Sequence, residues 1–596
     1  MFNKYPVNPV RNGKTYHTVA QGYDATFANC EQRLGLAGGG VRVVVADGVN
    51  GVDFDRFAEK WEAYFARREV QTRVIRTGEY VRSEDALVAH FRDNITDNRA
   101  FGYVTEEGVD AYFGEEARER CGRDIRTLRE ENGDGRTIVL VLGTGAHWLT
   151  GGGDLNLYLD ISRENQQILH KRGLCNFGFS RYTDNVEKYK IALFVEWPIL
   201  ETYRKRHLHE FDLFVDMNRP DEPVSVHTEE LSDIVKDIVK YPMRVKPFFA
   251  PGVWGGQYLK QLADLPEDWV NCAWSFEPIA PENSILIEVG GTVIEVPFLI
   301  VMDTDHLSVV GERVAGLFGD FFPIRFDYLD TMDGSNLSVQ VHPKQHYIRK
   351  TFNYPLEQQE SYYIMEKKPG SKVYLGLTDS CTEEAFLGAV MKAQETGEPI
   401  PFTEYVQEWD CEKGDLFLIP TGTVHCSGKD NLVLEISATT WWFTFKVYDY
   451  VRKDLDGKPR AINIDHAKAN IEWHKKREWV KDNLIQEPVL VGSQGANEEY
   501  RLGKRPDLLF YVNRINLVDQ WRDNTGGEVL LINLVEGERI RVRSVRQPEV
   551  SVELGYAESY ILPAVFGEFE IINLGSAPCK IVKAGVSPEW DVKIVE

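Results

Sequence analysis

Four polar side chains in the second half of the sequence have the types and spacing of a metal site. Gln340 and His342 are two residues apart in Gln-Val-His-Pro, so they share one face if this segment is a strand. His425 follows an apolar run and a Pro-x-Gly turn, and Glu360 lies between the two histidines at the head of Glu-Ser-Tyr-Tyr-Ile-Met. Two imidazoles, a carboxylate and an amide oxygen form a mixed nitrogen and oxygen set. Such a set suits Zn²⁺, with one position open for water or substrate.

Each of these signals is weak when it stands alone. A histidine after a Pro-x-Gly turn is usually a hydrogen-bonded turn residue, and a Gln-x-His pair in a strand usually lies on the surface. The combination, with a glutamate at the head of an intervening strand, favours a metal site instead. Because the set is made of nitrogen and oxygen donors, zinc, iron, manganese and cobalt all stay open as the ion.

These side chains must be positioned by β-strands. From Tyr241 onward, short alternating segments separated by Gly and Pro turns predict an antiparallel barrel or sandwich. The expected strands are Ile285–Val289, Thr292–Val296, Leu337–Val341, Tyr362–Met365, Lys372–Leu377, Asp415–Ile419 and Leu432–Ile436. Helical stretches are expected over Thr382–Thr396 and Asp465–Asn483. We therefore predict a metal-binding β domain with a helical insertion over residues 241–485.

A last all-β section follows, from about Leu508 to the end of the sequence. Its expected strands are Val529–Val535, Ile540–Val545, Glu549–Leu554 and Phe566–Leu574. We predict a second β-barrel over residues 486–596, and the two β sections can be paired barrels.

The first 240 residues follow a different pattern. Continuous β-branched and apolar runs indicate strands buried on both faces of a sheet, separated by amphipathic helices such as Phe54–Arg68 and Ser83–Asn94. The expected strands are Val41–Ala46, Thr137–Leu142, Leu155–Asp160, Ile191–Val195 and Phe211–Val215. Strands that alternate with helices predict a parallel sheet. We expect an α/β domain over residues 1–240.

The order of strand, glycine-containing turn and helix around Gly51 resembles P-loop kinases of the nucleoside or uridine kinase type. Phe194-Val-Glu-Trp-Pro-Ile and the run Phe211–Asp216 add to this likeness. A working loop ends in Gly-Lys-Ser/Thr, because the lysine binds the phosphates and the hydroxyl binds Mg²⁺. Here Gly51 is followed by Val52 and Asp53. The sequence therefore predicts a degenerate kinase-like domain kept for packing, dimerisation or regulation, and a live kinase is the disfavoured alternative.

The second part of the chain resembles type I mannose-6-phosphate isomerases, which are cupin proteins. The motifs that carry the resemblance are the second cupin motif Gly414-x5-Pro420-x-Gly422-x2-His425, Leu337-Ser-Val-Gln-Val-His-Pro343, Lys246-Pro-Phe-Phe with Val253-Trp-Gly-Gly256, Trp274-Ser-Phe, Val447-Tyr-Asp-Tyr-Val-Arg452 with Asp456-Gly-Lys-Pro-Arg460, and Ile561-Leu-Pro-Ala564. They cover roughly residues 243–596. The resemblance implies a cupin barrel followed by a second cupin-like barrel.

The resemblance also implies a ligand set and a reaction. The implied metal ligands are Gln340, His342, Glu360 and His425. The family interconverts mannose 6-phosphate and fructose 6-phosphate, and a Lewis-acidic metal stabilises the enediolate that forms when the C2 proton leaves. A base then returns the proton to C1. The candidate catalytic residues are Lys446, Glu435 and Arg452.

The match departs from the family on the wall of the expected active site. The family has an arginine where this chain has Lys446, and the two differ where a planar fork must hold an oxyanion. The family also has a lysine where Asp327 aligns, and a carboxylate there repels a phosphate. Arg325 can replace that lysine only if its strand is regular. Trp441 and Trp442 stand where small polar residues are usual, and they can narrow the pocket.

Composition limits the classes of partner. The 596 residues include 92 acidic and 68 basic side chains, and the net charge of −24 repels nucleic acid and anionic membranes. No apolar run approaches the ~20 residues of a membrane span, and the first residues lack the apolar core of a signal peptide. The eight scattered cysteines are typical of reduced thiols. We expect a cytoplasmic protein with a sugar-phosphate substrate and with no nucleic-acid or membrane partner.

The favoured function is therefore metal-dependent isomerisation of a sugar phosphate, in a chain that also carries an inactive kinase-like domain. The alternative is a cupin that binds or senses a sugar phosphate without converting it. Lys446 and Asp327 are the residues that favour this alternative.

Overall fold

The N-terminal part of the chain is built on one seven-stranded sheet. The computed structural model describes residues 2–36, 40–131, 136–454, 457 and 460–594, so most of the 456–460 motif lies outside the described residues. The order of the sheet is β2-β8-β7-β6-β3-β5-β4. Its strands are β2 (Ala20–Gln21), β3 (Val41–Gly48), β4 (Gln71–Arg76), β5 (Thr137–Leu142), β6 (Leu155–Asp160), β7 (Leu213–Asp216) and β8 (Val224–His227). Strands β3 to β7 are parallel, and β8 joins antiparallel to β7.

Successive residues of β3 face two different hydrophobic cores. Val44 and Ala46 pack into one core, and Val43 and Val45 pack into the other. The helices on the first face are α1 (Tyr23–Leu34), α2 (Phe54–Ala66) and α10 (Thr228–Ile238). Those on the second face include α3 (Glu84–His90), α5 (Ala117–Glu131), α6 (Ala146–Thr150) and α9 (Trp197–His207). Because both faces are covered, the strand is apolar throughout, and this explains the continuous run in the sequence.

The prediction of a strand at Ile191–Val195 is wrong. This segment lies in a continuous helical stretch made of α8 (Asn185–Ile191), the π-helical turn η4 (Ala192–Glu196) and α9. Phe194 and Val195 are buried in different cores, so the helix has apolar residues on more than one side. A short apolar run carries no periodicity that separates a buried strand from a buried helix.

Two antiparallel sheets form the first β unit of the C-terminal part. Their orders are β18-β15-β20-β13-β10-β9 and β17-β16-β19-β14-β21. The strands of the first sheet are β9 (Phe248–Ala250), β10 (Trp274–Phe276), β13 (Ile324–Asp330), β15 (Glu360–Lys367), β18 (Leu416–Ile419) and β20 (Asn431–Ala438). Those of the second are β14 (Val339–Val341), β16 (Lys372–Leu377), β17 (Val406–Asp410), β19 (His425–Ser427) and β21 (Phe445–Tyr448). The predicted antiparallel arrangement is confirmed.

Helices and one small sheet surround this β unit. The helices are α11 (Tyr258–Leu262), α12 (Phe298–Val310), α13 (Glu312–Phe318), α14 (Gln345–Phe352), α15 (Glu383–Thr396), α16 (Ile464–Asn470) and α17 (Arg477–Asn483). The expected insertion is confirmed at α15, where the Thr382 hydroxyl accepts a hydrogen bond from the Ala385 amide as the N-cap. Strand β1 (Val7–Pro9) pairs in parallel with β11 (Ser284–Val289), which pairs with β12 (Thr292–Pro297). The first strand of the chain thus lies with its C-terminal part.

The second β unit also consists of two antiparallel sheets, of orders β22-β23-β24-β31-β26-β29 and β25-β30-β27-β28. Its strands are β22 (Val489–Gln494), β23 (Asn497–Gly503), β24 (Phe510–Leu517), β25 (Gln520–Asn524), β26 (Leu530–Glu536), β27 (Arg539–Ser544), β28 (Ser551–Gly555), β29 (Ser559–Leu562), β30 (Glu568–Asn573) and β31 (Cys579–Val586). One hydrophobic core joins the two sheets, with Ile532 and Ile581 from one and Val542 and Ile571 from the other.

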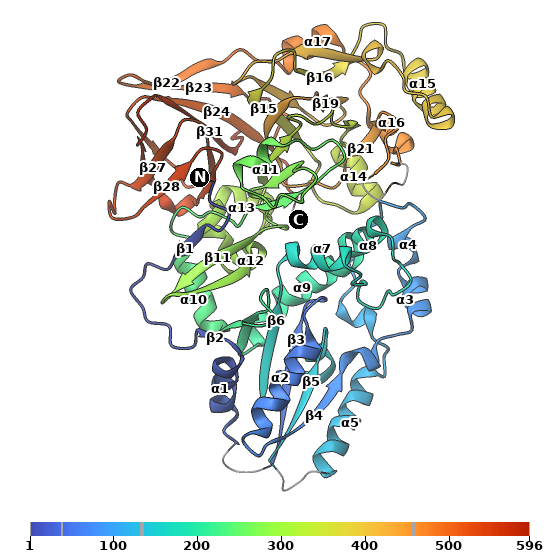
Figure 1. Cartoon of the computed structure of the whole chain (residues 1–596), viewed down its shortest axis with the longest axis vertical. Helices are drawn as coiled ribbons and strands as arrows, with labels where there is room; N and C mark the ends of the chain where they lie inside the picture. The colour runs from blue at the N-terminus through green and yellow to red at the C-terminus, as the bar shows by residue number, and fades with distance from the viewer. Residues whose placement is uncertain (1, 37–39, 132–135, 455–456, 458–459, 595–596) are drawn as a thin grey trace.

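The N-terminal part lies against the first β unit, as Figure 1 shows. Asp216 at the end of β7 accepts a hydrogen bond from the Glu295 amide of β12 at 2.8 Å. The Val104 amide donates to the carbonyl of Phe352, the last residue of α14, at 2.9 Å. One hydrogen bond to a side-chain carboxylate and one between backbone groups therefore connect the two parts directly. Among the described residues, no helix is long and apolar enough to cross a membrane.

Candidate metal centre

Two histidines and a glutamate converge between the two sheets of the first β unit. His342 follows β14 and His425 begins β19 in one sheet, whereas Glu360 begins β15 in the other. The Nε2 atoms of His342 and His425 lie 3.0 Å and 3.3 Å from Glu360 Oε2. One carboxylate oxygen therefore lies between two ring nitrogens, and all three side chains are buried. Facing sheets bring together ligands that are far apart in the sequence.

Backbone carbonyls orient both imidazoles. Nδ1 of His342 lies 3.2 Å from the carbonyl oxygen of Phe443, and Nδ1 of His425 lies 2.8 Å from that of Thr423. A carbonyl oxygen only accepts hydrogen bonds, so each Nδ1 carries a hydrogen, and Nε2 is the ring atom that would bind a cation at the centre. Burial lowers the pKa of His425, which favours the neutral ring that a metal needs. These donors fit a divalent cation such as Zn²⁺.

Gln340, the fourth predicted ligand, lies beside the His425 ring. In the sheet, Gln340 is directly opposite His425 on one side and Lys446 on the other, so the three side chains point to the same face. Gln340 Nε2 lies 3.2 Å from His425 Nε2. A half-turn of the terminal amide exchanges its nitrogen and oxygen with almost no change of shape, and presents the oxygen to a cation.

Arg325 lies at the centre of a buried charge cluster. Strand β13 is regular, and the Arg325 guanidinium forms ion pairs with Asp327 at 3.5 Å, with Glu360 at 3.1 Å and with Glu435. Burial raises the pKa of Asp327 to about 7 and that of Glu435 well above its usual range. Burial acts in the same direction on Glu360, but His342 holds the pKa of that carboxyl well below its usual range. A divalent cation bound beside this cluster would lower the pKa of the two raised carboxyl groups and favour their charged forms.

The three candidate catalytic residues occupy different positions. Glu435 belongs to the charge cluster, and Lys446 lies on the ligand face, where burial lowers the pKa of its amine to about 8. Arg452 is engaged in its own loop, where it donates to the Asn336 carbonyl at 2.7 Å and to Asp449 at 3.0 Å. The structure thus brings Glu435 and Lys446 to the ligands, whereas the contacts of Arg452 hold a neighbouring loop.

Two contributors to the centre were missed by the sequence analysis. The Gln358 amide donates to Glu360 Oε1 at 2.7 Å and so fixes the carboxylate. The alternation of residues in a strand could have revealed it, because Gln358 is two residues before Glu360. Phe443 acts through its backbone carbonyl, which no residue type reveals.

Trp441 and Trp442 contact the N-terminal part. The Trp442 ring lies 4.5 Å from the Tyr189 ring, and its indole nitrogen donates to the Ala100 carbonyl at 3.2 Å. The Trp441 indole donates to the Tyr189 hydroxyl at 3.3 Å. Both tryptophans immediately precede Phe443, whose carbonyl contacts His342. The expectation that they narrow the pocket stays a prediction.

The loop after β3 has local structural roles. Asp53 accepts a hydrogen bond from the Arg56 amide at 3.0 Å and so caps the N-terminus of α2. Gly51 has a φ of +100°, and a Cβ there would lie 3.1 Å from the side chains of Ile161 and Leu174. Apolar side chains therefore pack against the loop. The likeness to a kinase stays a prediction.

Known proteins resemble the two parts of the chain separately. Residues 22–240 match a family model described as a domain of unknown function, DUF8485. The mannose-6-phosphate isomerase ManA of Bacillus subtilis is 27% identical over 343 residues, which are 55% of this chain and 95% of that protein. The C-terminal part is homologous to type I mannose-6-phosphate isomerases.

Two further comparisons accompany this homology. The mannose-6-phosphate isomerase of Streptococcus mutans is 27% identical over 217 residues, covering 36% of this chain and 63% of that protein. The crystal structure of the mannose 6-phosphate isomerase from Bacillus subtilis superposes with a TM-score of 0.47 and 20% identity, over 58% of this chain and 100% of that one. The candidate metal centre lies in the isomerase-like part, outside the domain of unknown function.

Proposed function

We propose that this chain is a metal-dependent isomerase that interconverts mannose 6-phosphate and fructose 6-phosphate. The observation that carries the proposal is the convergence of His342, Glu360 and His425, with lone pairs aimed at one point, in a part homologous to enzymes of that name. Gln340 borders the same point. These four side chains would hold the ion, and the bound ion would act as a Lewis acid toward the sugar oxygens.

Lys446 is the residue that we assign to proton transfer. It lies on the same sheet face as the ligands and shares a register position with Gln340. Because burial lowers its pKa to about 8, roughly a tenth of the amine is neutral at pH 7. A neutral amine accepts a proton and an ammonium returns it, as transfer between C2 and C1 of the sugar requires.

A sugar-phosphate-binding protein without turnover is the second candidate. The observation that favours it is the engagement of Arg325, whose guanidinium is shared by Asp327, Glu360 and Glu435. A guanidinium held by three carboxylates is poorly available to a phosphate or an enediolate. On this hypothesis the metal and Lys446 bind the sugar phosphate, and proton transfer is absent.

A coupled assay of fructose 6-phosphate production from mannose 6-phosphate tests the proposal on the zinc-loaded full chain. We expect activity that a chelator abolishes and added zinc restores. Lys446→Ala should lower kcat by 10²-fold or more with a smaller effect on KM, because a general base acts on the chemical step. The matched control is Lys344→Ala, which removes a lysine that pairs with Glu472 at 3.5 Å.

The same preparation separates the two candidates. Zinc-loaded protein that binds mannose 6-phosphate in calorimetry without converting it would establish the second candidate. Protein that holds zinc but neither binds nor converts the sugar would contradict both.

A further inference from the structure

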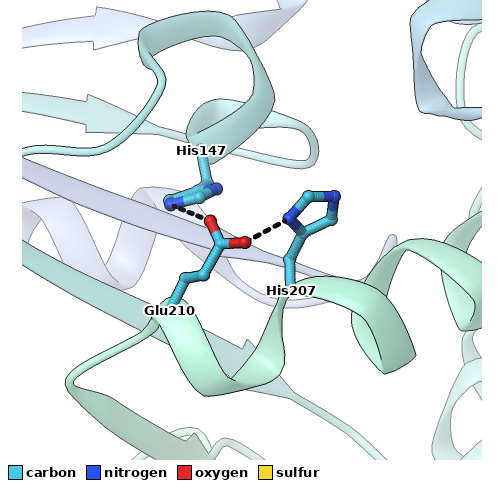
Figure 2. Close-up of side chains that lie close together, drawn as sticks. All are labelled: His147, His207 and Glu210. Atoms are coloured by element: carbon cyan, nitrogen blue, oxygen red, sulfur yellow. Dashed lines mark hydrogen bonds and ion pairs between the residues drawn. The ribbon is translucent and has the colours of Figure 1, made fainter.

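A second group of two histidines and a glutamate lies in the N-terminal part. His147 is on α6, His207 is the last residue of α9, and Glu210 ends the following 3-10 turn η5 (Leu208–Glu210). In Figure 2 the Glu210 carboxylate lies between the two rings, and each ring points a nitrogen toward it. The distances are 3.5 Å from His147 Nε2 to Glu210 Oε2 and 2.9 Å from His207 Nδ1 to Glu210 Oε1.

These separations suit one tetrahedral ion. Two donor atoms that each lie ~2.1 Å from a tetrahedral Zn²⁺ are ~3.4 Å apart. One potential ligand atom from each of the three residues lies within 4.8 Å of the others, so small side-chain rotations bring all three onto an ion. We propose that His147, His207 and Glu210 form a second metal site, which binds a divalent transition-metal ion of the zinc class. Two imidazoles and one carboxylate leave the fourth position open.

The backbone around the site is already fixed. The buried Asp47 carboxylate at the end of β3 accepts hydrogen bonds from the His147 amide at 2.8 Å and from the Tyr203 hydroxyl at 2.7 Å. Tyr203 lies one helical turn before His207, and their rings are 5.1 Å apart. One carboxylate thus holds both α6 and α9 close to the point where their histidines meet. This pre-organisation lowers the entropic cost of binding an ion.

The burial of the three side chains also suits a bound ion. The His147 side chain is 8% exposed, so its ring lies at the buried end of the site. The side chains of His207 and Glu210 are 36% and 41% exposed, which gives an ion access from solvent. In the His90–Glu107 pair of the N-terminal part, His90 Nε2 lies 3.6 Å from Glu107 Oε1. This pair has one imidazole, so it serves as a comparison with fewer potential ligands.

The site lies at the end of a helix that contacts the C-terminal part. Arg204 of α9 pairs with Asp303 of α12 at 3.5 Å, and Lys205 pairs with Asp320. An ion bound to His207 and Glu210 would fix the last turn of this helix against α6. The consequence is a stiffer connection between the sheet of the N-terminal part and the isomerase-like part.

Zinc stoichiometry of the full chain tests the proposal. Metal-free wild type, His207→Ala and the matched control His90→Ala are titrated with zinc against a chromophoric chelator, and bound zinc is counted by elemental analysis. We expect His207→Ala to bind one zinc ion fewer per chain than wild type and His90→Ala. Cobalt loading should give visible absorption that is weaker in His207→Ala than in wild type, because only the cobalt at the candidate centre between the β sheets then remains.

The result that overturns the proposal is an equal zinc count and an equal cobalt spectrum in wild type and His207→Ala. Glu210→Gln guards against an indirect effect, because it keeps the shape and removes the charge, and it should also lose one ion. Both side chains are partly exposed, so their replacement should leave the fold intact, and melting of the metal-free proteins checks this. The candidate metal centre between the β sheets keeps its own ligands in these variants, so zinc binding at that centre is measured separately.

Discussion

Backbone carbonyls set the orientation of the two imidazoles in the candidate metal centre. Each Nδ1 meets a backbone carbonyl, of Phe443 or of Thr423, so each Nε2 faces Glu360. Whether an imidazole can bind a metal ion depends on its protonation as much as on its residue type. The charge of a buried acid likewise depends on its surroundings.

Replacing one histidine of the centre should remove its ion. We expect His425→Ala to bind one zinc ion fewer per chain than wild type, because only one imidazole and one carboxylate then remain beside the weak amide oxygen of Gln340. Elemental analysis of chelator-treated and reloaded protein measures this. His346→Ala, an exposed histidine on α14, is the control and should keep the full count. Full zinc occupancy in His425→Ala would contradict the ligand assignment.

The buried carboxyl of Asp160, at the end of β6, should make the stability of the fold depend on pH. Burial raises the pKa of this carboxyl to about 7 from its ordinary 3.8, with Arg204 opposing the shift. Between about pH 4 and 7 the folded chain holds a proton that the unfolded chain has lost, so raising the pH through this window destabilises the fold. Asn cannot titrate. Asp160→Asn should therefore gain stability relative to wild type as pH rises from 5 to 8, by about 2–4 kcal/mol.

Thermal melting at the two pH values measures this difference. The control is Asp55→Asn, whose side chain is 83% exposed and should shift little. If the difference in Tm between Asp160→Asn and wild type were the same at pH 5 and pH 8, the assignment of the raised pKa would be wrong.

At the scale of elements, one carboxylate joins a strand to two helices. Asp47 at the end of β3 accepts hydrogen bonds from the amides of Gly48, Gly145 and His147 and from the hydroxyl of Tyr203. All of these donors are buried with it. Without the Asp47 carboxylate, each of these buried donors would lose its hydrogen-bond partner. The hydrogen bonds to Asp47 therefore contribute far more to stability than exposed hydrogen bonds do.

Asp47→Ala should cost about 3–5 kcal/mol, because it leaves buried amides without an acceptor. The measurement is the Tm of the full chain. Asp53→Ala provides the comparison, since it removes only the cap of α2 and should cost about 1 kcal/mol. Equal losses in the two variants would mean that the buried donors find other partners.

At the scale of the whole molecule, the N-terminal part supports the wall of the metal centre. Phe101 packs 6.3 Å from Phe443, and Tyr189 and Ala100 contact Trp442. Phe443 carries the carbonyl that orients His342. The contact between the two parts thus includes Phe443 itself and its chain neighbour Trp442.

Trp442→Ala should therefore weaken both the fold and metal binding. We expect a loss of about 2–3 kcal/mol from packing and a fall of about 10-fold in zinc affinity, because groups behind the ligands tune affinity by that order. Chelator competition measures the affinity. Trp409→Ala is the matched control, since Trp409 is half-buried on β17 and its indole donates to the Leu375 carbonyl within the β unit. An unchanged zinc affinity in Trp442→Ala would show that the two parts are not coupled through this contact.

The sequence predicted the elements whose pattern is local. The alternating runs around Glu360 and His425 identified strands, and the continuous run of β3 identified a sheet covered on both faces, because side-chain period follows burial. The run Ile191–Val195 had no such period, and its helix was predicted as a strand. The four ligand types were predicted from spacing and from resemblance to a family, and their binding of a metal stays a prediction.

Only the tertiary structure decided which groups surround the residues of the candidate sites. The contact of the Phe443 carbonyl with His342, the pairing of Arg325 with Glu360 and Glu435, and the meeting of His147 with His207 all join residues that lie far apart in the chain. Sequence spacing carries no information on such contacts, because they depend on how two sheets face each other or how two helices end at the same point. The residue types at a site are fixed by the sequence, whereas their charge, orientation and partners follow from packing.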